Sequence, residues 1–211
     1  MPDLFFAGAP LSGAETALVL VHGRGATAES ILGLGAEIAR GTPEVALVAP
    51  QAAGGTWYPH SFLAPHTDNE PHLSAAVQTV VAAVETARAA GVERIVLGGF
   101  SQGACLALEV AARHGSALGL AAAFGLSGAL IGTSNGPAGE TEFSYPTALA
   151  RMPVFAGCDP RDAHVPHARF LLSGAVFERL GAAADFRVLP GLGHSVSADE
   201  VTAVRALVIP A

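Results

Sequence analysis

Residues 94–114 read RIVLGGFSQGACLALEVAARH, and this segment is the most informative about the fold. Its first part is a β-branched apolar run typical of a buried strand, and the part after Ser101 has the period of a buried helix. Between them, residues 99–103 (GFSQG) match the G-x-S-x-G pattern of a tight strand-to-helix turn. The glycines two residues to either side of Ser101 remove Cβ atoms that would clash in such a turn. We therefore expect Ser101 Oγ to stand above the edge of a sheet, exposed to substrate.

Around this stretch, short apolar runs alternate with longer helical segments, which is the pattern of βα units on a mostly parallel sheet. The predicted strands are 17–22, 45–50, 94–99, 118–126, 153–157 and 185–189, with an edge strand expected within 2–15. The predicted helices are 27–40, 73–90, 102–114, 166–180 and 197–207. We expect a single α/β domain over residues 1–211, with a mostly parallel sheet flanked by helices and no large cap domain.

The composition of the chain excludes several classes of chemistry and of binding partner. A chain of 211 residues with 51% hydrophobic content can bury one sizeable core. The absence of lysine excludes a pyridoxal Schiff base, a P-loop lysine and a Ser-Lys dyad. A net charge of −7 disfavours nucleic acid and anionic membranes as partners, so a small neutral molecule is expected. No basic, apolar leader and no bilayer-length apolar run is visible, which predicts a cytoplasmic protein without membrane insertion.

Two glycine- and proline-containing stretches, 52–71 and 128–149, are long enough to be functional loops, and we expect both to form rims of the active site. The first carries Trp57 and Tyr58, an aromatic pair suited to walling an acyl or aryl group. The alternative for Trp57 is that it packs in the core.

A serine hydroxyl is a poor nucleophile near neutral pH and requires a general base that is itself oriented by a third group. In a sheet of this kind the chain order is Ser, then Asp or Glu, then His, each after a strand. His194 lies on a glycine-flanked turn before the last predicted helix and is the expected base. Asp159 and Asp162 both follow the strand that ends at Gly157. We favour Asp162 as the acid and expect Asp159 to be a solvated turn residue or a helix cap.

Catalysis at Ser101 further requires two main-chain N–H groups aimed at the developing oxyanion. One is expected from Gln102, the residue after the nucleophile. The second is expected from Arg24, because Gly23 and Gly25 beside it, directly after a predicted strand, allow close backbone approach. The alternative is that these glycines only form a turn.

Several segments together resemble the phospholipase/carboxylesterase family of small α/β-hydrolases, which includes acyl-protein thioesterases and bacterial carboxylesterases. The segments are, in chain order, residues 22–25 (HGRG), 50–52 (PQA), 57–62 (WYPHSF), 99–103 (GFSQG), 162–166 (DAHVP) and 193–194 (GH). The resemblance covers nearly the whole chain. The chain departs from the family pattern at the acid, where the family usually has Asp-Pro-x-Val/Ile-Pro and this chain has Ala163 after Asp162.

By this resemblance the fold is that of an α/β-hydrolase, and Ser101, Asp162 and His194 take the positions of the catalytic triad. Arg24 and Gln102 supply the oxyanion hole through their main chains, and Trp57 lines the acyl site. With Gly23 and Tyr58, Trp57 completes the expected substrate-binding residues. The implied activity is hydrolysis of carboxylic esters. The absence of a large cap domain and the net charge of −7 further lead us to expect neutral esters with short to medium acyl chains. No cofactor is expected, and the protein is expected to be a monomer or homodimer.

Three alternatives remain at this point. An acyl-protein thioesterase or a lysophospholipase would use the same triad, but would call for a longer apolar channel. A non-catalytic small-molecule binding protein could also use this fold, because fold does not fix function. A metal site at Asp162, His164 and His167 is not expected, since no further ligand converges on them.

Overall fold

A computed structural model describes residues 3–132 and 143–209. It contains a seven-stranded sheet with the order β1-β3-β2-β4-β5-β6-β7. Only the edge strand β1 is antiparallel to its neighbour, and all other neighbouring strands are parallel. The strands are β1 (Leu4–Gly8), β2 (Thr16–Val21), β3 (Val45–Pro50), β4 (Arg94–Phe100), β5 (Ala122–Leu126), β6 (Pro153–Cys158) and β7 (Ala183–Val188).

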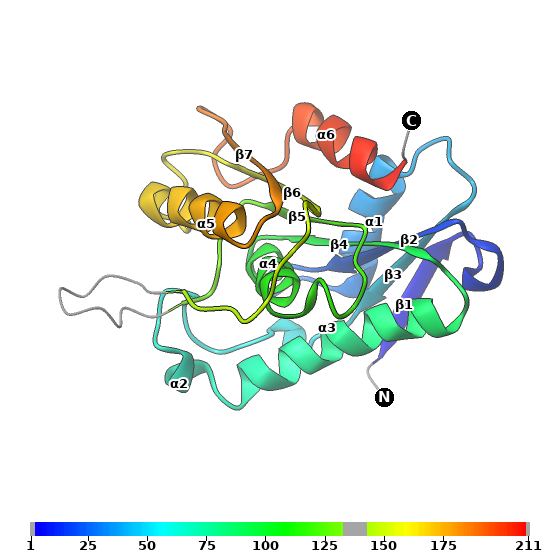
Figure 1. Ribbon diagram of the computed structural model, residues 1–211, viewed down its shortest axis with the longest axis horizontal. Coiled ribbons are helices and arrows are strands. Elements are labelled where there is room, and N and C mark those ends of the chain that lie inside the picture. The colour runs from blue at the N-terminus through cyan, green and yellow to red at the C-terminus, as the bar shows by residue number, and fades with distance from the viewer. Residues whose placement is uncertain (1–2, 133–142, 210–211) are drawn as a thin grey trace.

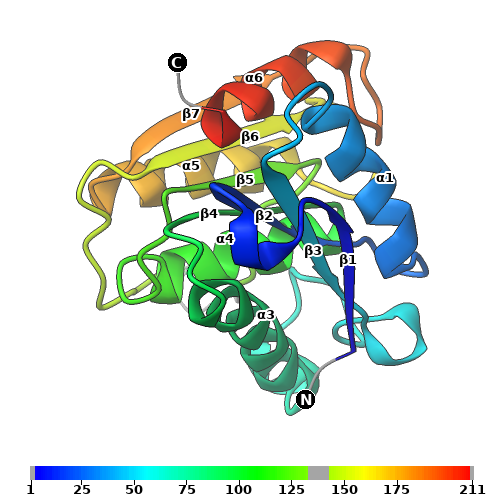
Figure 2. The same cartoon turned by 90° about the vertical axis from the view of Figure 1, so that its right-hand side faces the viewer.

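Helices cover both faces of this sheet (Figures 1 and 2). They are α1 (Ala28–Ile38), α2 (His66–Asn69), α3 (His72–Ala89), α4 (Gln102–His114), α5 (His167–Arg179) and α6 (Ala198–Val208). Helices α3, α4 and α5 pack on one face, and α1 and α6 pack on the other. The predicted α/β class, with a mostly parallel sheet flanked by helices and no large cap domain, is confirmed.

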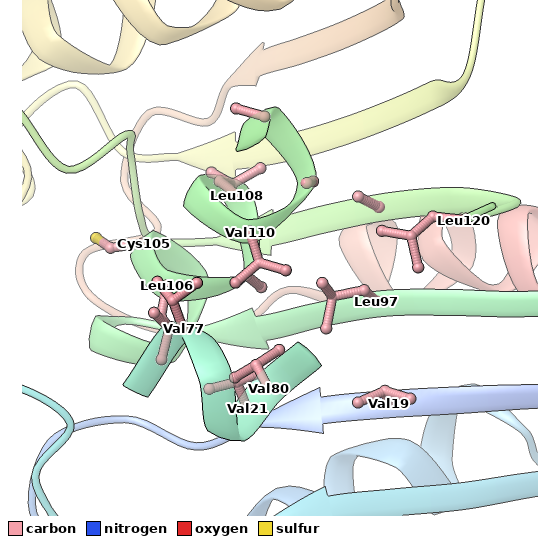
Figure 3. Packing of buried hydrophobic residues seen from close by; sticks show 14 of the residues in the cluster. Val19, Val21, Val77, Val80, Leu97, Cys105, Leu106, Leu108, Val110 and Leu120 are labelled. Carbon is pink, nitrogen blue, oxygen red and sulfur yellow. The ribbon is translucent and has the colours of Figure 1, made fainter. Parts of the chain in front are cut away.

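The core surrounds α4, in which every residue from Gln102 to Ala112 is buried. Figure 3 shows the side chains of Leu106 and Val110 facing Val80 of α3 and Leu97 of β4. A helix buried on all sides must carry apolar residues around its whole circumference, which is why residues 102–112 lack the polar stripe of a surface helix. Helix α4 is thereby a rigid support for Ser101 at its N-terminus.

Ser101 forms the turn between β4 and α4 with φ 56° and ψ −121°. This conformation costs a non-glycine residue about 1–3 kcal/mol and persists only when the surroundings enforce it. Here Ser101 N donates to Leu126 O at 2.9 Å, and Ser101 O accepts from Cys105 N at 3.0 Å. A Cβ on Gly103 would lie 2.0 Å from Val21 O, so the turn packs directly on the end of β2. The predicted strand-to-helix turn is therefore present, with glycine where the backbones meet.

One predicted strand is clearly shorter in the structure. The strand predicted for 118–126 begins only at Ala122, because the N–H groups of Leu118 and Leu120 donate back to His114 O and Gly115 O. Gly119, with φ 60°, closes this turn after α4. The second predicted rim loop, 128–149, contains residues 133–142, which lie outside the described residues.

A test of the turn compares two glycines with opposite surroundings. Gly103→Ala places a methyl group against the Val21 carbonyl, and we expect the free energy of unfolding to fall by about 1–3 kcal/mol. Gly33→Ala in α1 meets open space and should raise it by about 0.5–1 kcal/mol through helix propensity. Urea unfolding of both variants is the measurement. Stabilisation of the protein by Gly103→Ala would contradict the close packing of this turn on β2.

Candidate active site

Five loops meet at the carboxyl ends of the parallel strands, which is where open α/β sheets bind ligands. Gly23 follows β2, Ser101 follows β4, Ser127 follows β5, Asp162 follows β6 and His194 follows β7. A cavity of about 580 Å³ lies over this edge, and Ser101, His194 and Gly23 are among its lining residues. The fold thus brings together residues that are far apart in the sequence.

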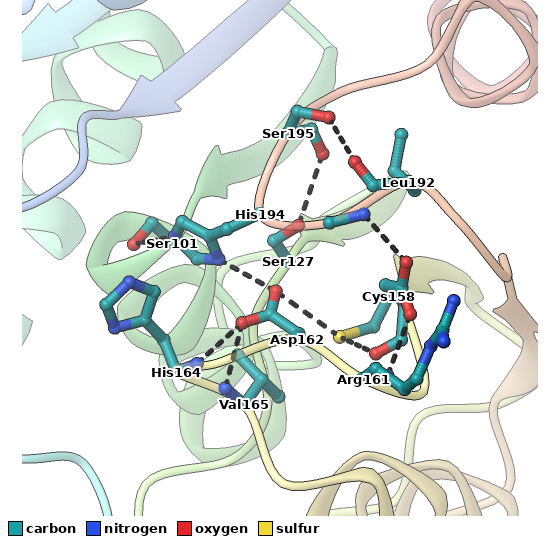
Figure 4. Close-up of polar contacts among 12 residues, drawn as sticks. Ser101, Ser127, Cys158, Arg161, Asp162, His164, Val165, Leu192, His194 and Ser195 are labelled. Atoms are coloured by element: carbon teal, nitrogen blue, oxygen red, sulfur yellow. Dashed lines mark hydrogen bonds and ion pairs between the residues drawn. The ribbon is translucent and has the colours of Figure 1, made fainter.

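The side chains of Ser101, His194 and Asp162 form a continuous row of contacts (Figure 4). His194 Nε2 is 2.8 Å from Ser101 Oγ, and His194 Nδ1 is 2.8 Å from Asp162 Oδ2. A carboxylate accepts hydrogen bonds, so Nδ1 carries the proton and Nε2 is left to accept from the serine hydroxyl. The Asp162 side chain is fully buried and that of His194 is 23% exposed, so the imidazole lies between the carboxylate and the cavity.

Asp162 and Asp159 occupy different positions behind this row. Asp162 Oδ1 accepts the main-chain N–H groups of His164 at 2.7 Å and Val165 at 3.1 Å, which holds the carboxylate toward His194. The Asp159 carboxylate instead accepts from Arg161 N and Gly193 N. The expectation that Asp159 is solvated is wrong, since it is only 3% exposed and lies against the turn that carries His194.

The turn at His194 is held on both sides. Gly193 N donates to Asp159 Oδ2 at 2.7 Å, and Ser127 Oγ donates to Ser195 O at 3.2 Å (Figure 4). The hydrogen bonds from Gly193 N and Arg161 N lower the pKa of Asp159, because they stabilise its charged form. Asp159 therefore remains an acceptor for the turn over the neutral pH range.

His22 supports the loop that carries Arg24 and is completely buried. Its Nδ1 is 2.8 Å from Gly23 O, and its Nε2 accepts from Ala52 N at 3.1 Å. These partners make Nδ1 the protonated nitrogen and fix the tautomer. Because the carbonyl and N–H of one peptide point in opposite directions, a Gly23 carbonyl held by His22 turns the N–H of Arg24 away from His22. Burial lowers the pKa of His22 from its ordinary value of 6.5, so the ring is neutral.

Arg24 and Gln102 both line the cavity, and their side chains have partners that the sequence did not indicate. The Arg24 guanidinium donates to the carbonyl oxygens of residues 58, 59 and 60. Gln102 Oε1 accepts from Trp57 N, and Gln102 Nε2 donates to Tyr58 O. Every residue has a main-chain carbonyl group, so the sequence does not indicate which of them accept these hydrogen bonds.

The structure corrects the role expected for Trp57. Its side chain is 5% exposed, its Nε1 donates to His22 O at 2.8 Å, and it is absent from the lining of the cavity over Ser101. The alternative, that Trp57 packs in the core, is the one observed. Tyr58 and Gly23 do line the cavity, although Tyr58 is 1% exposed and contributes mainly as a buried part of the wall.

Two rings beside His194 were not predicted as site residues. The ring of His164 lies edge-on to that of His194 with 4.6 Å between centroids, and Phe100 lies at 5.1 Å. Both residues line the cavity. The sequence offered one indication of their role: Phe100 directly precedes Ser101, and His164 lies two residues after Asp162.

A metal-binding cluster and a membrane-spanning helix are both absent from residues 3–132 and 143–209. Within these ranges no three His, Cys, Asp or Glu side chains are grouped so as to hold a metal ion. No helix in the same ranges combines the length and apolarity needed to cross a membrane.

With this geometry in hand, comparison with known proteins places the chain in a family. The model of the phospholipase/carboxylesterase family matches residues 6–208. The chain belongs to this family. A phospholipase/carboxylesterase from Dyadobacter fermentans DSM 18053 superposes with a TM-score of 0.84 at 33% identity, covering 97% of this chain and 95% of that chain. The resemblance inferred from the motifs is thus confirmed.

Two further proteins are similar to this chain. Acyl-protein thioesterase 1 of Gibberella zeae is 35% identical over 115 residues, which is 54% of this chain and 46% of that protein, so the match spans less than half of the relative's length. The Bacillus cereus carboxylesterase has a TM-score of 0.74 at 20% identity, over 97% of this chain and 92% of that chain, and shares the fold. The proteins similar to this chain therefore include carboxylesterases and an acyl-protein thioesterase.

The neutral state of His22 predicts a pH-dependent stability. The unfolded chain binds a proton on His22 as the pH falls below about 6.5, whereas the folded chain resists protonation, so folding stability decreases from about pH 7.5 to pH 5.5. His22→Gln should reduce this dependence, measured by urea unfolding at the two pH values. His72→Gln, at an exposed position, is the control and should leave it unchanged. Equal slopes for the wild type and His22→Gln would show that His22 is not held neutral.

Proposed function

We propose that the protein is a serine carboxylesterase that hydrolyses neutral carboxylic esters with short to medium acyl chains through an acyl-serine intermediate. The observation that carries the proposal is the row of two 2.8 Å contacts from Ser101 Oγ through His194 to Asp162 Oδ2, at the mouth of a cavity. Membership of an esterase and thioesterase family supports the same chemistry.

In the proposed mechanism, Ser101 Oγ attacks the ester carbonyl while His194 Nε2 takes the hydroxyl proton. Asp162 keeps Nδ1 protonated and stabilises the imidazolium that forms. The main-chain N–H groups of Arg24 and Gln102 stabilise the tetrahedral oxyanion. His194 then gives its proton to the leaving alcohol, and water activated by the same imidazole hydrolyses the acyl-serine. No cofactor is required.

The acyl-chain preference follows from the cavity. It holds about 580 Å³, and Phe62, Phe100 and Val165 are among the apolar side chains that line it. Each methylene buried there contributes about 0.8 kcal/mol, but only while apolar wall remains to cover it. Affinity should therefore rise over the first few carbons and then level off. The net charge of −7 adds no repulsion for neutral esters.

An acyl-protein thioesterase or lysophospholipase activity is the second candidate, favoured by the partial match to the Gibberella zeae enzyme. It differs from the first in requiring long acyl chains. A binding protein without turnover is the third, and it would lack reactivity at Ser101.

The nucleophile and the base are tested together. Ser101→Ala should reduce kcat by about 10⁶-fold, and His194→Ala should cost about the same, because the two residues act as a unit. The double variant should be little worse than either single one. Steady-state hydrolysis of a p-nitrophenyl ester, with circular dichroism as the check on folding, provides the measurement. Wild-type turnover in a folded Ser101→Ala variant would refute the mechanism.

The two aspartates are distinguished by a matched pair of substitutions. Asp162→Asn removes the carboxylate that fixes the His194 tautomer and should lower kcat by about 10⁴-fold. Asp159→Asn keeps one acceptor oxygen for the turn and should cost less than about tenfold, since about 1 kcal/mol is typical of a single hydrogen bond. A larger loss for Asp159→Asn would reverse the assignment of the acid.

A series of p-nitrophenyl esters from acetate to palmitate tests the substrate class. We expect kcat/KM to rise and then fall across acyl chains of about two to eight carbons, as added methylenes cease to be covered. A steady rise through palmitate, or activity confined to lysophospholipids, would instead favour the second candidate.

A further inference from the structure

The segment 57–60, of which residues 58–60 line the catalytic cavity, is held by the side chains of Arg24 and Gln102. Arg24 Nη1 donates to Pro59 O at 3.0 Å, and Arg24 Nη2 donates to Tyr58 O at 3.0 Å and His60 O at 2.8 Å. We call these three contacts, with the two made by the Gln102 side chain, the wall clamp.

The two side chains meet at one atom. Tyr58 O accepts both Arg24 Nη2 at 3.0 Å and Gln102 Nε2 at 2.9 Å, while Gln102 Oε1 accepts Trp57 N at 3.1 Å. Arg24 lies in the loop after β2, and Gln102 begins α4. The Tyr58 carbonyl therefore links, through side chains, the two residues whose main chains are the proposed oxyanion donors.

The Arg24 guanidinium acts by holding main-chain groups in place rather than by pairing with a charge. Within the described residues, no carboxylate lies within ion-pair distance of Arg24, and the side-chain hydrogen bonds found there go to main-chain oxygens. A planar guanidinium presents several donors in a fixed arrangement, which suits three successive carbonyl groups. Lysine has a single ammonium and cannot reproduce this arrangement. The same loop is also tied to the segment at one main-chain contact, Gly25 N to Gly55 O at 2.7 Å.

We propose that Arg24 is a positioning residue in addition to its main-chain role. Its side chain fixes the segment 57–60 relative to the oxyanion donors. The reaction rate and the selectivity among acyl chains therefore both depend on the wall clamp. This proposal rests on the proposed function. A displacement of about 1 Å in such a site costs on the order of 10²-fold in rate, so loss of the clamp should appear mainly in kcat. Because the same segment lines the cavity, acyl selectivity should weaken at the same time.

The first experiment compares Arg24→Met, Arg24→Lys and the control Arg40→Met, whose side chain is exposed on the surface. For Arg24→Met we expect kcat on the best ester to fall by about 10- to 100-fold, with KM changed less than about threefold, because the oxyanion contact matters most in the transition state. The differences in kcat/KM between acyl chain lengths should shrink. Arg24→Lys should recover only a small part of the rate, and Arg40→Met should match the wild type.

Chemical rescue separates positioning from simple folding. In Arg24→Ala, added methylguanidine should restore kcat severalfold at millimolar concentrations, because the free guanidinium can occupy the site of the missing side chain. Sodium chloride at the same ionic strength should not. A double-mutant cycle between Arg24→Met and Gln102→Met should be non-additive, since the two side chains share Tyr58 O.

The outcomes distinguish this proposal from the proposed function. Wild-type turnover that depends on Ser101, together with wild-type kcat and selectivity in Arg24→Met, would overturn the clamp alone. Absence of wild-type turnover would overturn the proposed function. In that case the clamp is tested by amide hydrogen exchange, which should be faster in residues 55–62 of Arg24→Met than of Arg40→Met. Unchanged exchange in that segment would reject the clamp as well.

Discussion

The left-handed backbone conformation of Ser101 sets the geometry of the whole site. A serine with φ 56° is unfavourable by itself, and it is maintained here because both flanking segments are fixed. Strand β4 lies in the middle of the sheet, and α4 is buried along nearly its whole length. Gly99 and Gly103 let the turn contact the end of β2, where a Cβ on either glycine would lie 2.5 Å or less from Val21 O. The core thus stabilises a turn that holds the hydroxyl at the edge of the sheet.

The segment from Gln51 to His60 is a second scaffold around this turn. It supplies acceptors for Arg24 and Gln102, receives the Gly25 N–H, and contributes the Trp57 indole that donates to His22 O. The buried His22 connects the same segment to the Gly23 carbonyl. The wall of the cavity and the loops beside Ser101 are consequently parts of one hydrogen-bonded unit.

The sequence predicted the features that depend on local pattern and strand order. The G-x-S-x-G turn, the parallel sheet and the positions of Asp162 and His194 after successive strands could be inferred because each has a spacing that only a few folds produce. The start of β5 at Ala122 could not be inferred from the sequence, because the preceding N–H groups donate to the end of α4. The prediction for Trp57 was wrong because an aromatic residue in a polar loop is typical of a substrate-binding surface. In the structure the loop folds back, and the indole donates to a main-chain carbonyl in the core. The contacts of Arg24 were invisible because their acceptors are carbonyl groups, which every residue possesses.

The proposed mechanism is tested most directly by trapping the acyl group on Ser101. The enzyme is quenched in acid during turnover of p-nitrophenyl butyrate, digested with trypsin and examined by mass spectrometry, in which residues 95–113 form one peptide. We expect a butyryl group on this peptide, assigned to Ser101 rather than Cys105 by fragmentation, and its loss in Ser101→Ala. A butyryl group on another residue, or turnover without any acylated peptide in either the wild type or Asp162→Asn, would contradict an acyl-serine intermediate at Ser101.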